Sequence, residues 1–154
     1  MKAFEKYTLS NYTSEHLSVL RNGYIEWDGE KWLTNMHSII RLNNPRLKVP
    51  KSTGYIDIGN LIHKDLVPYR EIADKDIIKY DKTISGKREI KSVREGLGFT
   101  NSLITIDNDM FGKMCKMNGN DEFHFLIKGK YVMYLYTREG IDYKFEGFIL
   151  GIRE

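Results

Sequence analysis

The C-terminal third of the chain, residues 103–153, constrains the fold most, because its local signals follow one another as strand, short helix, hairpin and closing strand. Residues 103–106 form a short run rich in β-branched side chains, and Asp107 then occupies the position of a helix N-cap. An apolar stripe follows at helical spacing, formed by Met110, Phe111, Met114 and Met117. Gly119 can supply the left-handed residue that ends such a helix.

Three further strands are predicted after this helix. Residues 122–127 and 131–136 are rich in aromatic and branched side chains and are joined through Lys128 and Gly129. Gly140 marks the next turn, and residues 143–152 close the unit with bulky side chains. No residue of the unit has the character of a catalyst.

The N-terminal part carries a second hairpin signal. Residues 24–27 and 31–34 flank Asp28 and Gly29, a pair that tolerates the positive φ values of a tight turn. Residues 35–42 continue as a strand or a bulge, and Asn43-Asn44-Pro45 interrupts them.

The other predicted elements are less sharply bounded. Strands are expected at 4–9 and 55–58, helices at 15–21 and 60–66, and a small hairpin between 77–80 and 82–84, whereas 87–98 is a basic surface segment or linker. The pattern of strand, helix and hairpin thus occurs near both ends of the chain, which makes an internal repeat plausible. We predict one α+β domain over residues 1–154, with approximate halves 1–68 and 101–154 and a basic connecting region 69–100.

Composition limits the class of protein. A chain of 154 residues with 41% hydrophobic residues can bury the core of one domain, or of two small half-domains that share a core. No apolar run approaches the roughly 20 residues that cross a bilayer, and the N-terminus lacks a signal-peptide core. A single cysteine, Cys115, excludes an internal disulfide and fits a reducing interior. We therefore expect a cytoplasmic protein without a membrane partner.

The net charge of +3 is too small to indicate nucleic-acid binding by itself, but the basic residues are clustered. Two stretches, 41–51 and 82–94, hold all nine candidates, and for either stretch alone a solvated loop is the commoner meaning. The candidate DNA-facing residues are Arg41, Arg46, Lys48, Lys51, Lys82, Lys87, Arg88, Lys91 and Arg94.

No motif for catalysis or metal binding is present in the sequence. The four histidines, His16, His37, His63 and His124, have no spacing typical of a metal site. The acidic residues stand at expected caps and turns, and no glycine-rich phosphate loop or nucleophile motif occurs. Tyrosines in the predicted strands could stack on bases, although packing in the core is the commoner role for such residues. We expect no enzyme activity, no cofactor and no metal.

Two segments resemble parts of the bacterial DNA polymerase sliding clamp. The first, Leu-Thr-Asn-Met-His-Ser-Ile-Ile at 33–40, follows a hairpin and resembles the Ala-Thr-Asp-Gly-His-Arg-Leu-Ala segment of that family. The second is the C-terminal unit, whose ending Gly-Phe-Ile-Leu-Gly-Ile-Arg at 147–153 is similar to the family's Val-Met-Pro-Met-Arg-Leu tail. The resemblance covers about half of the chain. Asn35, Met36, Ser38 and Gly151 depart from the family pattern, and the chain is shorter than the family's three-domain subunit.

The resemblance implies a DNA-clamp-like fold of repeated strand-helix-strands halves, with antiparallel sheets packed on short helices. In the family, helices line a ring that encircles DNA without reading its sequence, and partner proteins insert a short apolar peptide into a pocket. The pocket residues implied here are Thr34, Met36, His37, Ser38, Ile39, Phe148, Ile149, Leu150 and Ile152.

The leading hypothesis is a non-catalytic, clamp-like protein of DNA replication, possibly phage-encoded and homo-oligomeric, that binds DNA, replication proteins or both. The alternative is a phage-encoded β-rich binding protein that inhibits or sequesters a host or defence factor. A third hypothesis, a nuclease or phosphoesterase, would need acidic residues that converge only in three dimensions.

Overall fold

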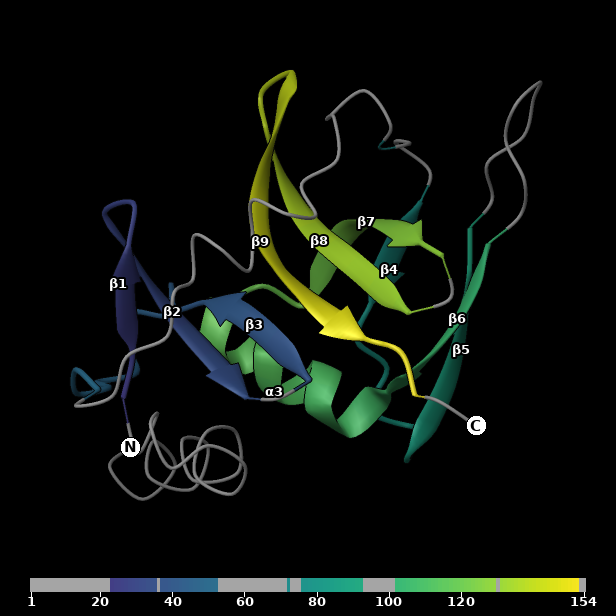
Figure 1. The fold of residues 1–154 in the computed structure, drawn as a ribbon, viewed down its shortest axis with the longest axis horizontal. Helices are drawn as coiled ribbons and strands as arrows, with labels where there is room; N and C mark the ends of the chain where they lie inside the picture. Colours follow the sequence, from purple (N-terminus) through teal and green to yellow (C-terminus); the bar gives the residue numbers. More distant parts are fainter. Residues whose placement is uncertain are drawn as a thin grey trace.

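The computed structural model describes residues 23–35, 37–52, 72, 76–92, 102–129 and 131–152. One helix and nine strands are assigned in this part of the chain, and Figure 1 shows α3 lying across one face of the larger sheet. The elements are β1 (Ile25–Trp27), β2 (Glu30–Asn35), β3 (Ser38–Arg41), β4 (Ile77–Lys79), β5 (Lys87–Lys91), β6 (Leu103–Asp107), α3 (Asn108–Asn118), β7 (Glu122–Lys128), β8 (Val132–Glu139) and β9 (Asp142–Leu150).

The larger sheet has seven strands in the order β1-β2-β3-β9-β8-β7-β4, and every neighbouring pair is antiparallel. Two three-stranded meanders, β1–β2–β3 and β7–β8–β9, meet edge to edge through their last strands. A separate two-stranded sheet pairs β5 with β6. The predicted α+β class is compatible with this architecture, in which antiparallel strands predominate.

The C-terminal unit agrees with its prediction from the sequence. The Asp107 carboxylate accepts hydrogen bonds from the amides of Asp109 and Met110, at 3.0 and 3.1 Å, and so caps α3. Gly119 ends the helix at φ 86° and donates its N–H to the Cys115 carbonyl. The strands β7, β8 and β9 then follow in the predicted order. These features were predictable because each signal acts within a few residues of the element that it bounds.

The predicted hairpin between β1 and β2 is also confirmed. Asp28 and Gly29 have φ values of 52° and 72°, which a two-residue turn with left-handed backbone requires. Trp27 and Trp32 flank the turn, with ring centroids 6.1 Å apart.

The region between the halves differs from its prediction. The prediction of a hairpin between 77–80 and 82–84 is wrong, because β4 pairs with β7 instead and Lys82 and Thr83 form a turn. The surface segment predicted from residue 87 onward begins as strand β5, which pairs with β6 along its whole length. The sequence of β5 hides the strand, since only Ile90 of its five residues is buried. The elements predicted at 4–9, 15–21, 55–58 and 60–66 lie outside the described residues.

The two faces of the large sheet have different cores. The predicted apolar stripe of α3 packs against one face, where Phe111, Met114 and Met117 meet Leu33 and Ile40. The other face is aromatic: Trp32 and Ile39 form one cluster, Tyr134 and Tyr136 form another, and Phe145 and Phe148 pack against both clusters. Packing is therefore the role of Tyr134 and Tyr136, both of which are buried.

A buried ionic network joins the two meanders to α3. Arg41 of β3 donates from Nε to Glu146 Oε1 at 2.6 Å and from Nη2 to Glu146 Oε2 at 3.1 Å. Glu146 also accepts from Asn118 Nδ2 and from the Thr137 hydroxyl. At the rim of the network, Glu30 accepts from Arg41 and from Lys144, each at 3.0 Å. Burial opposes ionisation of Glu30, but these two cations outweigh it and lower the pKa of that carboxyl.

Replacing Arg41 by Met should lower the free energy of unfolding by about 3–5 kcal/mol, because the wholly buried Glu146 then loses its cation. Denaturant titration measures this loss. Arg46→Met, at an exposed position, is the control and should change stability by no more than about 0.5 kcal/mol. Equal stability of the two variants would contradict a structural role for the network.

Candidate functional site

The two segments that resemble the clamp family are neighbouring strands. In the β3–β9 pair, Ser38 is opposite Ile149, Ile39 is opposite Phe148 and Ile40 is opposite Gly147. The Leu150 amide extends the contact by donating to the His37 carbonyl at 2.8 Å. Figure 1 shows these strands side by side at the middle of the sheet. The fold thus brings together segments that are more than 100 residues apart in the chain.

Four of the nine predicted pocket residues are buried: Thr34 on β2, Ser38 and Ile39 on β3, and Ile149 on β9. Ile39 belongs to the aromatic face and Ile149 to the face covered by α3, as alternation along paired strands requires. The Thr34 hydroxyl donates to the Ser38 carbonyl at 2.7 Å. These side chains pack inside the protein and do not line an open hollow. Met36 lies outside the described residues.

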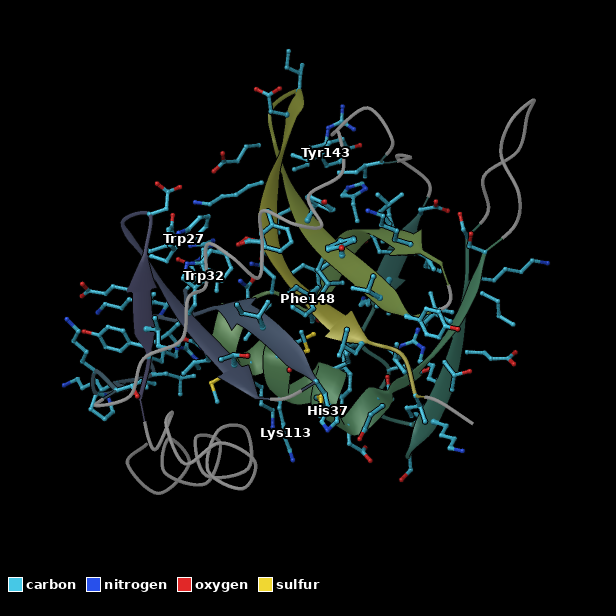
Figure 2. The ribbon with its side chains drawn as sticks, in the orientation of Figure 1. Trp27, Trp32, His37, Lys113, Tyr143 and Phe148 are labelled. Atoms are coloured by element: carbon cyan, nitrogen blue, oxygen red, sulfur yellow. The ribbon has the colours of Figure 1, made fainter. Side chains whose placement is uncertain are left out.

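The accessible members lie where β9 ends. His37 is exposed, Phe148 and Ile152 are half-buried, and Leu150 is 38% exposed. Figure 2 places His37 beside the start of β3, close to this end of the sheet.

Two exposed apolar residues that the sequence analysis did not select flank this end of β9. Tyr131 is 58% exposed, and its carbonyl accepts the Gly151 amide at 2.7 Å. Leu103 is 46% exposed on β6, where the Thr105 carbonyl accepts the Ile152 amide. We call the set His37, Leu103, Tyr131, Leu150 and Ile152 the tail surface. The sequence offers Tyr131 only as a tyrosine that could stack on bases and gives no signal for Leu103, because the backbone contacts of the tail with Tyr131 and with β6 join residues distant in the chain.

The candidate DNA-facing residues are divided between the interior and the surface. Arg41 is only 8% exposed, and its guanidinium is occupied by Glu146 and Glu30, so the structure places it away from any bound phosphate. Arg88 is half-buried, and Arg94 lies outside the described residues. The remaining candidates are exposed: Arg46, Lys48, Lys51, Lys82, Lys87 and Lys91.

The two basic stretches reach opposite ends of α3. The loop after β3 contacts the C-terminal end, where Asn43 and Asn44 donate backbone N–H groups to the Met117 carbonyl and Asn44 Nδ2 donates to the Lys116 carbonyl. At the N-terminal end, the Asn108 amide donates to the Gly86 carbonyl. The helix itself carries Lys113 and Lys116, and Figure 2 shows Lys113 on the side of α3 away from the sheet. The helix and the loops that contact its two ends thus carry Arg46, Lys48, Lys82, Lys113 and Lys116, which we call the basic surface along α3.

No catalytic or metal arrangement stands out in the described part of the chain. No group of three or more His, Cys, Asp or Glu side chains there could hold a metal ion. Cys115 is buried on α3, and this burial raises the pKa of its thiol to about 12, which disfavours the reactive thiolate. Among the described residues, no helix combines the length and the apolar character needed to span a membrane.

Comparison of the chain with protein-family models, with curated proteins and with solved structures gave no significant match.

Replacing Gly147 by Ala should disrupt the β3–β9 junction, because a Cβ atom at this position would overlap the Ile39 carbonyl oxygen. The Ile39 oxygen is a backbone atom of β3, which is paired with β9, so it cannot move aside freely. A loss of about 1–3 kcal/mol in unfolding free energy is therefore expected. Thermal or denaturant unfolding measures it. Gly140→Asn is the control, since nothing lies within 4 Å of that turn position and Asn tolerates its left-handed backbone. Similar stability of both variants would mean that β3 and β9 approach less closely.

Proposed function

We propose that this protein is a non-catalytic, clamp-like protein that acts in the cytoplasm during DNA replication, binding DNA along α3 and partner proteins at the tail surface. The observation that carries the proposal is the β3–β9 pairing, because it joins the two segments that resemble the walls of the clamp's peptide pocket.

The sheet order supports the proposal. A duplicated half related by a two-fold axis predicts two equal meanders that meet through equivalent strands. Six of the seven strands follow this pattern, in the order β1-β2-β3-β9-β8-β7 with three strands on each side of the β3–β9 junction, and β4 adds an unmatched strand at the edge of the second meander. The second meander is preceded by β6 and α3.

The charge around α3 supports DNA as one ligand. In the clamp family the helices face DNA, and here exposed cations stand on the helix, at Lys116, and in the loops that contact its two ends, at Arg46, Lys48 and Lys82. Side chains of this kind bind phosphates without reading base sequence, because their attraction to the backbone is electrostatic.

The tail surface supports an apolar peptide as the other ligand. Leu150, Tyr131 and Leu103 are the accessible apolar residues, and His37 adds a polar group at the edge. Partly apolar peptides bind such surfaces by burying a few anchor side chains. The contact proposed here therefore involves the exposed members of the predicted pocket, because the buried members cannot reach a partner without unfolding.

Leu150→Glu should weaken binding of a labelled clamp-binding peptide from a bacterial replicative polymerase by about tenfold or more, which corresponds to ~1.4 kcal/mol. The cause is a charge placed where an apolar anchor is expected to bind. Fluorescence anisotropy measures the affinity. Ile141→Glu introduces the same charge at a residue that is 87% exposed at the opposite end of β9, and it should leave affinity unchanged. Equal affinities of the two variants would remove the tail surface from the proposal.

DNA binding should weaken steeply with salt. If three to five of the cations along α3 contact phosphates, a plot of log K against log salt should have a slope of about −3 to −4.5. Filter retention or anisotropy with a short DNA duplex measures it, and a sizing column gives the oligomeric state. Lys48→Glu should reduce the affinity more than Lys128→Glu, a matched change on β7. No DNA retention, together with tight binding of a monomer to one host protein, would instead favour the inhibitor alternative.

A further inference from the structure

A hollow lined by polar and charged residues lies between the end of β4 and the start of β5, and it shares no residue with the tail surface. Its volume is about 540 Å³. The residues that line it are Lys79, Tyr80, Asp81, Lys82, Thr83, Arg88 and Asp121. Lys79 and Tyr80 belong to neither of the basic stretches found in the sequence, so the hollow is a product of the fold.

The walls of the hollow are held in place before any ligand arrives. Asn108, wholly buried at the start of α3, donates from Nδ2 to the Asp81 carbonyl at 2.9 Å and to the Ile84 carbonyl at 2.7 Å. Within the turn, Asp81 Oδ1 accepts from the amide and the hydroxyl of Thr83. The Tyr80 amide donates to the Asp121 carbonyl at 2.8 Å. A pre-ordered site loses less conformational entropy when it binds.

Hydrogen bonds from one nitrogen of Arg88 fix the orientation of its guanidinium, and the other two nitrogens remain available for a bidentate contact. Nη1 donates to the Lys79 carbonyl at 2.9 Å and to Asn108 Oδ1 at 3.2 Å. Nε and Nη2 form no hydrogen bond with any residue in the described ranges. These two nitrogens form the side-on edge of a guanidinium, which matches two oxygens of a phosphate.

The two lysines of the hollow have no counter-ion in the part of the chain that the structure describes. Lys79 stands opposite Glu122 in the β4–β7 pair but makes no ion pair with it. Lys82 is exposed at the turn and also lacks an acidic partner there. Both ammonium groups can therefore move toward an anion in the hollow.

The balance of charge indicates which anion fits. Lys79, Lys82 and Arg88 contribute three positive charges, and Asp81 and Asp121 contribute two negative charges, which leaves an excess of one. The hydrogen bonds from Thr83 lower the pKa of the Asp81 carboxyl, so this acid stays ionised at neutral pH. A monoanion brings the charge of the hollow to zero, whereas a dianionic phosphomonoester would leave a net charge of −1 there.

We propose that the hollow binds one phosphodiester group of a DNA strand, with the Nε and Nη2 edge of Arg88 donating to its two free oxygens and Lys79 and Lys82 beside them. The choice of DNA as the source of the phosphodiester rests on the proposed function. The hollow would then fix one point of the backbone, in addition to the diffuse attraction along α3.

The first test uses a small phosphodiester in place of DNA. Titration of the full chain with dimethyl phosphate, a phosphodiester monoanion, should shift the NMR signals of the Arg88 Nε–H and the Thr83 amide in a saturable way. Inorganic phosphate at pH 8, mostly a dianion, should bind more weakly. Absence of a saturable shift with dimethyl phosphate, or a preference for the dianion, would overturn the site whether or not the protein binds DNA.

The second test uses a short DNA duplex and the variant Lys79→Ala, because Lys82 also belongs to the basic surface along α3. Loss of one phosphate contact should reduce the slope of log K against log salt by about 1. The control Lys128→Ala removes the same charge at an exposed position on β7 and should leave the slope unchanged. Equal slopes for the two variants, with retained DNA binding, would overturn the site and leave the proposed function standing. No DNA binding by the unaltered protein would overturn the proposed function and the DNA assignment, while the dimethyl phosphate titration still decides whether the hollow binds a phosphodiester.

Discussion

The ion pair between Arg41 and Glu146 is the interaction on which the arrangement of the sheet depends. Both groups are buried, so their removal from water carries a large cost that is offset only when each charge is fully hydrogen-bonded. Glu146 meets this requirement through Arg41, Asn118 and Thr137, which come from β3, α3 and β8. A shift of any of these elements would leave a charge unpaired in the interior, so the network selects one register for the two meanders.

The junction that this network stabilises also explains how the surface is divided. Gly147 lets the backbones of β3 and β9 approach closely, and the aromatic rings of Trp32, Phe145 and Tyr134 follow one another across the junction. Packed side chains therefore occupy the middle of the sheet. Accessible apolar and basic groups are found at its periphery, where β9 ends and where α3 meets its flanking loops.

The sequence predicted what local signals specify and missed what distant contacts specify. The cap at Asp107, the stop at Gly119 and the turn at Asp28-Gly29 act over a few residues, so β6 to β9 and the first hairpin could be predicted. Strand β5 could not, because its pairing with β6 leaves a single apolar residue facing inward. Arg41 was expected at the surface for a similar reason, since the partner that buries it lies 105 residues further along the chain.

The backbone groups at both ends of α3 are hydrogen-bonded within the protein itself. At its start, the amides of Asn108, Asp109 and Met110 donate to Gly86 and Asp107, and at its end the carbonyls of Cys115, Lys116 and Met117 accept from Gly119, Asn43 and Asn44. No amide at the helix start is left to hold an anion, in contrast to phosphate loops that use backbone N–H groups. Any polyanion held along this helix is therefore held by side chains, so acetylation of the lysines would weaken the attraction to that of Arg46 alone, whereas guanidination, which keeps their charge, would preserve it.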